Sequence, residues 1–234
     1  MITLHGFSSS NYYNKVKLAL LEKNVQFNED FVFPADKAML AHSPLGKVPY
    51  ISTPEGSVCE SYVIMDYIED RYPTPALLPE DSFARAKVRE ISLYLELHIE
   101  LVARRLYTEA FFGGKVSDSV KAKTGEELRR NVPALFQLCK FTPFIAGDTF
   151  TMADCAAIVH FPLLSLATKV IYGEDILANT PAKEYLKAMA TRPHVNKVRE
   201  DQKSSQAAFN DYVKARSAKV MAEKIAEKSD QGAQ

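Results

Sequence analysis

Two neighbouring residues in the first third of the chain have side chains that suit an α-amino-acid ligand. Glu60 and Ser61 stand in the stretch CESYVIMDYI, where a strand pattern changes to a helical one. A serine at such a point is commonly a helix N-cap, but its hydroxyl and the free N–H groups of the first turn also suit a ligand carboxylate. The Glu60 carboxylate suits an ammonium group. Together the two residues would hold both charges of an α-amino-acid end.

The motif GKVP, from Gly46 to Pro49, is a second candidate for ligand binding. Because proline has no N–H, it often lies at the edge of a sheet, and this ordinary interpretation needs no ligand. The alternative is a cis peptide bond between Val48 and Pro49, since such bonds usually mark a specific tight turn. It would turn the Val48 N–H and C=O outward, where they can pair with an extended, peptide-like ligand.

A cluster of hydroxyl groups opens the stretch SSSNYYNKVKLALLEK, residues 8 to 23, which continues as an amphipathic helix. A helix start needs one such group as its cap, and this one offers several. The surplus suggests that one hydroxyl is directed at a ligand while another caps the helix.

Composition and spacing argue against several kinds of partner. The chain has 234 residues with 29 Lys+Arg and 29 Asp+Glu, and this balance does not indicate a nucleic acid or an anionic membrane as partner. We see no apolar run long enough for a membrane span and no signal-peptide pattern at the N-terminus, so we expect a cytoplasmic protein. The five histidines and three cysteines show no metal-ligand spacing, so we expect no metal.

The elements that must position these residues fall into two groups. Residues 1 to 72 predict the order βαβαββα, and residues 73 to 82 form a proline-rich linker. Only helical patterns follow, including a long helix over residues 88 to 106 and a nearly all-apolar, buried helix that starts at Met152. We therefore expect an α/β domain over 1–75 and an all-α domain over 83–234, with a frayed tail after about residue 215.

Two features of the helical part have a mainly structural interpretation. Thr151 and Asp154 are spaced as a capping box at the start of the apolar helix. Tyr107, Phe111 and Phe112 end the long helix, where they either pack in the core or form an apolar substrate wall between the domains.

These motifs, in this order, resemble the cytosolic glutathione transferases, and in particular bacterial-like members of the serine type. The matching stretches are SSSNYYNKVKLALLEK, SPLGKVPYI, CESYVIMDYI, ALLPED and FIAGDTFTMADCAA. The resemblance implies a thioredoxin-like N-terminal domain, an all-α C-terminal domain and a homodimer, with the third and fourth helices at the interface. It also implies a glutathione site on the first domain and an apolar electrophile site between the two domains.

The resemblance assigns roles to individual residues. The Val48 backbone would pair with the cysteinyl unit of glutathione, while Glu60 and Ser61 would bind its γ-glutamyl end. Lys47, in the GKVP position where related members carry Lys or Gln, would reach a carboxylate, and Lys37 would bind the glycyl carboxylate. Tyr107 and Phe111 would contact the electrophile.

The family's chemistry requires a thiolate, because a neutral thiol is a poor nucleophile. A hydroxyl that donates to sulfur stabilises the anion, and the positive end of a helix adds to the effect. In the serine type, counting back six residues from Val16 of the Lys15–Val16 pair selects Ser10, although a slip of one residue would select Ser9. We expect Asn11 or Ser9 to cap the helix, which would leave Ser10 for the sulfur.

The sequence leaves three functions open. The first is a transferase that adds glutathione to an apolar electrophile. The second is a glutathione-dependent peroxidase or isomerase on the same fold, which shares the thiolate. The third is a non-enzymatic regulatory or assembly module, against which the intact GKVP and Glu60–Ser61 motifs argue.

Overall fold

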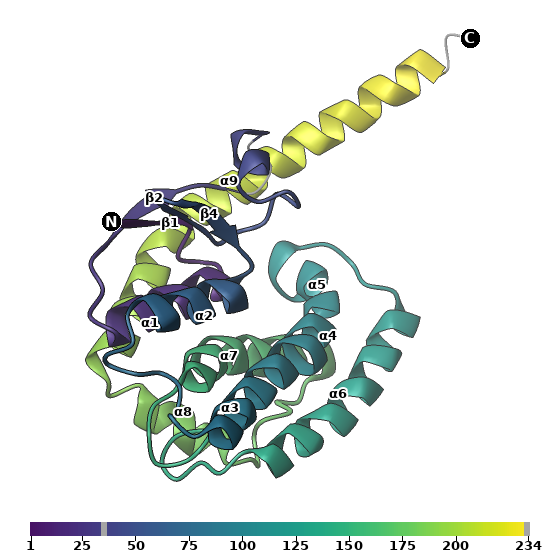
Figure 1. Cartoon of the computed structure of the whole chain (residues 1–234). Coiled ribbons are helices and arrows are strands. Elements are labelled where there is room, and N and C mark those ends of the chain that lie inside the picture. The colour runs from purple at the N-terminus through teal and green to yellow at the C-terminus, as the bar shows by residue number, and fades with distance from the viewer. Residues whose placement is uncertain (34–36, 232–234) are drawn as a thin grey trace.

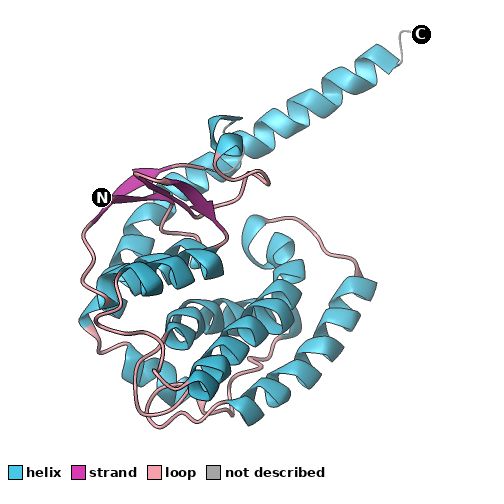
Figure 2. Cartoon of the chain, in the orientation of Figure 1, coloured by secondary structure: helices cyan, strands magenta, loops and turns pink. Residues whose placement is uncertain are grey.

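The chain begins with a four-stranded mixed sheet, shown as magenta arrows in Figure 2. The computed structural model describes residues 1–33 and 37–231, without the side chains of Lys37 and of residues 216–231. Its strands are β1 (Ile2–Gly6), β2 (Phe27–Phe31), β3 (Tyr50–Thr53) and β4 (Gly56–Cys59), in the order β2-β1-β3-β4. Strand β1 is parallel to β2 and antiparallel to β3, which is antiparallel to β4.

Two α-helices of this first part, α1 (Asn11–Glu22) and α2 (Ser61–Arg71), lie on the same side of the sheet (Figure 1). The paired residues Leu4 of β1 and Ile51 of β3 are fully buried against the apolar faces of these helices. The predicted βαβαββα order is confirmed with one difference: the second helix is a 3-10 turn, Lys37–Ala41.

The predicted long helix is present as one continuous helical run whose hydrogen-bond pattern changes along its length. It consists of α3 (Ser82–Tyr94), a π-helical turn (Leu95–Glu100), α4 (Leu101–Ala103), a 3-10 turn (Arg104–Leu106) and α5 (Tyr107–Phe112). Residues with the predicted apolar spacing are buried, for example Val88, Ile99 and Leu106. The sequence did not indicate the π turn, a feature often found at functional sites.

The remaining helices are α6 (Asp118–Leu138), α7 (Met152–Tyr172), α8 (Ala182–Met189) and α9 (Pro193–Gln231). Helix α7 lies at the centre of the helical part and also packs against α1. It is long and apolar enough to cross a membrane by length and composition alone, but half of its apolar window is buried inside the protein. The predicted Thr151–Asp154 capping box at its start is confirmed.

One hydrophobic core runs through both parts of the molecule. The segment predicted as a linker joins α2 to α3 and contributes the buried side chains of Leu77 and Leu78. The N–H groups of both residues donate to the carboxylate of Glu69, which also pairs with the buried Lys23. The connection is therefore packed against the body of the protein.

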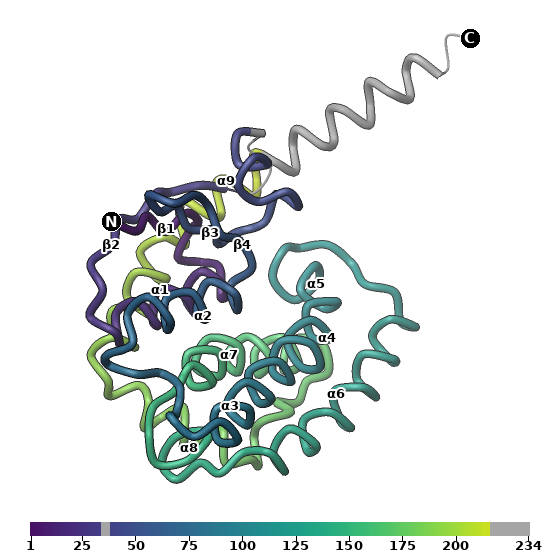
Figure 3. The backbone as a smooth tube through the Cα atoms, viewed as in Figure 1, coloured from purple at the N-terminus to yellow at the C-terminus, as the bar shows by residue number. Residues whose placement is uncertain are grey.

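Helix α9 returns the chain to the first part, where it runs beside α1 (Figure 3). Lys17 of α1 pairs with Asp201 at 2.7 Å, and the hydroxyl groups of Ser9 and Ser205 are 3.2 Å apart. The frayed tail predicted after about residue 215 falls on residues whose side chains lie outside the described part of the chain.

Candidate functional site

Ser10 occupies the N-cap position of α1, with φ −84° and ψ 122°. Its hydroxyl oxygen accepts a hydrogen bond from the Tyr13 N–H at 3.3 Å. The expectation that Asn11 or Ser9 caps the helix is therefore wrong. A hydroxyl has one proton to donate beside its acceptor lone pairs, so the cap leaves the Ser10 proton available for a ligand.

The neighbours of Ser10 have other partners. The Ser9 hydroxyl bonds with Ser205 of α9. The Asn11 amide nitrogen lies 2.9 Å from a Glu100 oxygen and 3.0 Å from His160 Nδ1, and its oxygen accepts from Arg104 at 3.1 Å. These contacts hold the start of α1 against the helical part.

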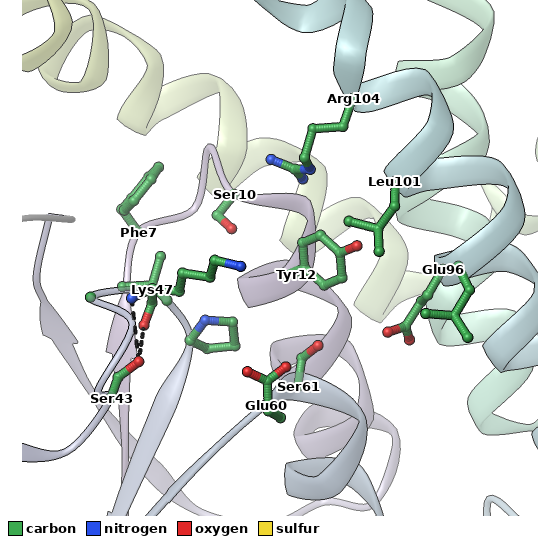
Figure 4. A pocket seen from close by; sticks show the side chains of 14 residues that line it. Phe7, Ser10, Tyr12, Ser43, Lys47, Glu60, Ser61, Glu96, Leu101 and Arg104 are labelled. Atoms are coloured by element: carbon green, nitrogen blue, oxygen red, sulfur yellow. Dashed lines mark hydrogen bonds between the residues drawn. The ribbon is translucent and has the colours of Figure 1, made fainter. Parts of the chain in front are cut away.

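The Val48–Pro49 peptide bond of the GKVP motif is cis, as the second interpretation of that motif predicted. Gly46, with φ +63°, supplies the left-handed conformation that the turn requires. Ser43 holds the backbone of Lys47 in place, because its hydroxyl donates to the Lys47 carbonyl at 2.8 Å and accepts from the Lys47 N–H (Figure 4). Among the described residues, none makes a hydrogen bond to the Val48 backbone.

Glu60 and Ser61 lie one position later in the helix than the sequence indicated. Glu60, with φ +67°, is the N-cap residue of α2, and its side chain does not cap the helix. Ser61 is the first helical residue and is buried, and its hydroxyl has no partner among the described residues. Both side chains therefore remain available to the cavity that they line.

A cavity of about 370 Å³ brings most of the predicted residues together. Ser10, Lys47, Val48, Glu60 and Ser61 all line it, on the side of the sheet domain. The opposite wall is Glu96, Leu97, Leu101 and Arg104, which come from the π turn and the residues just after it (Figure 4). Lys37 starts the 3-10 turn, and its side chain is outside the described part of the chain.

A second cavity of about 700 Å³ lies between α5, α7 and α9. Tyr107 and Phe111 line it, as expected for an apolar substrate wall, and Phe209 of α9 lines it as well. Phe7, Ser10 and Arg104 line both cavities. Ser10 therefore stands at the boundary between the two.

A buried polar network beneath this boundary was not indicated by the sequence. The Glu100 carboxylate, which is 1% exposed, accepts hydrogen bonds from Asn11, from the Tyr12 hydroxyl and from the Arg104 guanidinium. Although burial opposes it, the neighbouring His160 and the hydrogen bonds from Arg104 and the Tyr12 hydroxyl hold the pKa of Glu100 below its ordinary value. Burial also raises the pKa of the Tyr12 hydroxyl, so Tyr12 stays protonated and donates.

His160 of α7 completes the network. Burial lowers its pKa to about 3, so the ring is neutral near neutral pH. Its Nδ1 atom then accepts the hydrogen bond from the Asn11 amide. The network joins three separate segments, α1, the long helical run and α7, so no single sequence motif identifies it.

A comparison with protein families confirms the character of the first part. Residues 4–76 match the model described as glutathione S-transferase, N-terminal domain. The chain is also 41% identical to a glutathione S-transferase of Pseudomonas putida over 218 residues, which are 92% of this chain and 99% of the relative.

The chain belongs to the glutathione S-transferase family. The extent of this identity also confirms the prediction of an enzyme, a glutathione transferase, over that of a non-enzymatic module. Within the described residues, no group of three or more His, Cys, Asp or Glu side chains is arranged to hold a metal ion.

Solved structures of glutathione transferases share the fold. A glutathione S-transferase from Rhodospirillum rubrum F11 has a TM-score of 0.67 at 25% identity, covering 85% of this chain and 91% of that one. Another, from Methylobacterium radiotolerans, has a TM-score of 0.70 at 24% identity, over 84% and 93% of the two chains, and is described as a complex with glutathione sulfonate. The predicted thioredoxin-like domain with an all-helical second part is thus confirmed.

Proposed function

We propose that the protein is a cytoplasmic, serine-type glutathione transferase. Glutathione binds in the first cavity and an apolar electrophile binds in the second. The position of Ser10 carries this proposal: it lines both cavities, and its hydroxyl proton is not used by the helix cap. A sulfur held beside this hydroxyl would face the second substrate.

The first cavity has the chemistry that glutathione requires. Glu60 matches the ammonium and Ser61 the carboxylate of the γ-glutamyl end, and both line one end of the cavity. The free Val48 backbone matches the cysteinyl unit, and Lys47 matches a carboxylate. Lys37 is retained as a proposed ligand of the glycyl carboxylate. The glutathione sulfonate named for the related Methylobacterium radiotolerans enzyme supports this choice of ligand.

The reaction begins with loss of the thiol proton to solvent, which leaves a thiolate. The Ser10 hydroxyl donates to that sulfur, and the N-terminus of α1 adds its partial positive charge. With an aryl halide, the thiolate forms the carbon–sulfur bond, the carbon–halogen bond breaks and halide leaves. A downward pKa shift of about 2 units requires about 2.7 kcal/mol, within reach of a charge-assisted hydrogen bond plus a helix end.

Replacement of Ser10 by alanine tests the role of its hydroxyl. Near neutral pH, Ser10→Ala should lower kcat/KM for a chloronitrobenzene about three- to tenfold, as expected if the thiol pKa rises by about 1 unit, or about 1.4 kcal/mol, while the N-terminus of α1 remains. Glutathione affinity by calorimetry should change only a few-fold. Because the cap is also lost, stability should fall by about 1 kcal/mol.

Two further variants test whether the loss of activity comes from the Ser10 hydroxyl itself. Ser9→Ala removes a neighbouring hydroxyl that bonds with Ser205, and it should retain most of the activity. Ser10→Thr retains both cap and hydroxyl and should restore much of the rate. Equal rates for Ser10→Ala and wild type would show that another group stabilises the thiolate.

We also propose a homodimer. Apolar side chains on α2 and α3 support it: Val63, Phe83 and Leu93 are 50%, 74% and 41% exposed. Such exposed groups on adjacent helices are suited to burial against a second copy. Sedimentation analysis should give about twice the 26.2 kDa of one chain, and a species of single-chain mass at micromolar concentration would contradict the proposal.

A further inference from the structure

The two cavities differ in the sign of the charges that line them. The first has both signs, with the carboxylates of Glu60 and Glu96 and the cations of Lys47 and Arg104. The second has Arg104 and Lys214, and none of its described lining residues is Asp or Glu. An uncharged apolar molecule makes no use of two cations, so the second cavity is better matched to a ligand with a negative charge.

Arg104 directs part of its guanidinium into this space. Its Nε and Nη2 groups donate to Glu100, and Nη2 also donates to the Asn11 side chain at 3.1 Å. Its Nη1 group makes no hydrogen bond to any described residue, and the side chain is 43% exposed. In Figure 4 the guanidinium points towards the side of the cavity where the Ser10 hydroxyl lies. Glu100 therefore fixes the orientation of a donor that is still free.

The orientation of Arg104 is restrained from its other sides as well. The guanidinium carbon lies 5.1 Å from the centre of the Tyr12 ring and 5.2 Å from that of Tyr107. A cation held between two rings and a carboxylate loses little further freedom when an anion binds. Arg104 is thus pre-organised to bind an oxyanion beside the reacting sulfur.

The wall formed by α9 adds a second cation and several amides. Lys214 is exposed and has no carboxylate partner among the described residues. The side-chain amides of Gln202, Gln206 and Asn210 line the same wall. The facing side is apolar and consists of Ala110, Phe111, Phe112, Leu163 and Leu166. One side therefore suits a planar apolar body and the other a polar, anionic group.

We propose that the preferred electrophile of the second cavity is an aromatic or other apolar acid, whose carboxylate is held by Arg104 and Lys214. This inference rests on the proposed function, and it replaces the expectation of a wholly apolar electrophile by one that carries a negative charge. The apolar body would pack on Phe111 and Phe112, with the reacting carbon facing the sulfur beside Ser10.

A matched pair of substrates tests this inference. A chloronitrobenzoate and the corresponding chloronitrobenzamide have nearly the same shape, but only the acid is charged. Each kcat/KM is divided by the uncatalysed rate with glutathione, which removes the difference in intrinsic reactivity. Wild type should then favour the acid at least about tenfold, as expected for one charge-assisted hydrogen bond.

Three variants locate the source of the preference. Lys214→Gln and Arg104→Gln should each reduce it several-fold, mainly through a higher KM for the acid, while the rate with the amide changes less. Lys203→Gln removes an exposed lysine of the same helix that does not line the second cavity, and it should leave the preference unchanged. Among the described residues Lys214 has no carboxylate partner to lose, so its variant remains informative even if Arg104→Gln folds poorly.

The outcomes separate this inference from the proposed function. Wild type that conjugates acid and amide equally well, or Lys214→Gln and Arg104→Gln variants that keep the full preference, would overturn the inference and leave the transferase intact. Wild type that neither binds glutathione by calorimetry nor conjugates either compound would overturn both.

Discussion

The two cavities meet at Ser10 but are built in different ways. The first is made largely from short segments of the sheet domain, such as residues 43 to 49 and 60 to 61, with one wall from the π turn. The second is made from helices that are far apart in the sequence, α5, α7 and α9. The difference matches the proposed division of roles: a mixed-charge site for glutathione, which carries both an ammonium and carboxylates, and a largely apolar site with two cations for the electrophile.

The largest effect is expected at the boundary that both cavities share. His160 supports it from below and is neutral in the folded protein, because burial lowers its pKa to about 3 from 6.5. Between these values the unfolded chain binds a proton that the folded chain does not. Stability is therefore unaffected by this group above about pH 6.5 and falls as pH decreases towards 3, by up to about 1.4 kcal/mol for each pH unit.

His160→Asn isolates this contribution, because the asparagine oxygen can replace Nδ1 as the acceptor for Asn11. Chemical denaturation of both proteins between pH 4 and 7 should show a shallower loss of stability for the variant, a difference of about 2 to 3 kcal/mol over two pH units. The same slope for both proteins would mean that His160 is protonated in the folded state or that the network relaxes around it.

A second change should affect the first cavity alone. The double variant Glu60→Gln/Ser61→Ala removes one carboxylate and one hydroxyl that line it. Loss of two polar contacts to charged groups should raise the Kd for glutathione about 100-fold, or about 2.7 kcal/mol, by calorimetry. The KM of the electrophile at saturating glutathione should change less than about threefold.

Glu55→Gln is the matched control for this double variant, because Glu55 is an exposed carboxylate on the turn between β3 and β4 and lines neither cavity. If it weakened glutathione binding as strongly, the effect would come from net charge and not from contact.

A third change should affect the second cavity alone. Phe111 is half-buried there and packs on Tyr107 with 4.8 Å between ring centres. Phe111→Ala should raise the KM of an aromatic electrophile about tenfold, or about 1.4 kcal/mol, because apolar contact area is lost. The Kd for glutathione should stay within about twofold.

Phe31→Ala removes a phenylalanine that is 54% exposed and lines neither cavity, so its KM should match that of wild type. Equal increases in KM and in the glutathione Kd for Phe111→Ala would show that the two cavities are coupled rather than separate.

The same difference explains what could be predicted from the sequence. GKVP and Glu60–Ser61 are local motifs in which the backbone turn and the side chains depend on neighbouring residues, so the sequence located one wall of the first cavity. Ser10 was found by spacing within one helix. Its capping role was missed because a single hydroxyl can accept from the helix and still donate to a ligand.

The other wall had no local signal. Arg104 and Glu100 belong to a helical pattern whose apolar spacing is nearly regular, and the π turn that directs Glu96 and Leu97 to the cavity leaves that spacing unbroken. The part of α9 that lines the second cavity lies about 100 residues after Arg104 in the chain, so only the packed structure shows that they meet. The fold could be predicted where the apolar spacing is regular. For the second cavity the sequence indicated Tyr107 and Phe111, but not Arg104 or the residues of α9 that lie opposite them.

The most direct test of the account is the ionisation of glutathione bound to the enzyme. Titration of the complex, followed by the ultraviolet absorbance of the thiolate, gives the pKa of the bound thiol in wild type, Ser9→Ala and Ser10→Ala. We predict a pKa about 2 units below the free-thiol value of about 8.5 in wild type and Ser9→Ala, and a return of at least 1 unit towards it in Ser10→Ala. The same low pKa in Ser10→Ala would contradict the assignment of Ser10 as the group that stabilises the thiolate.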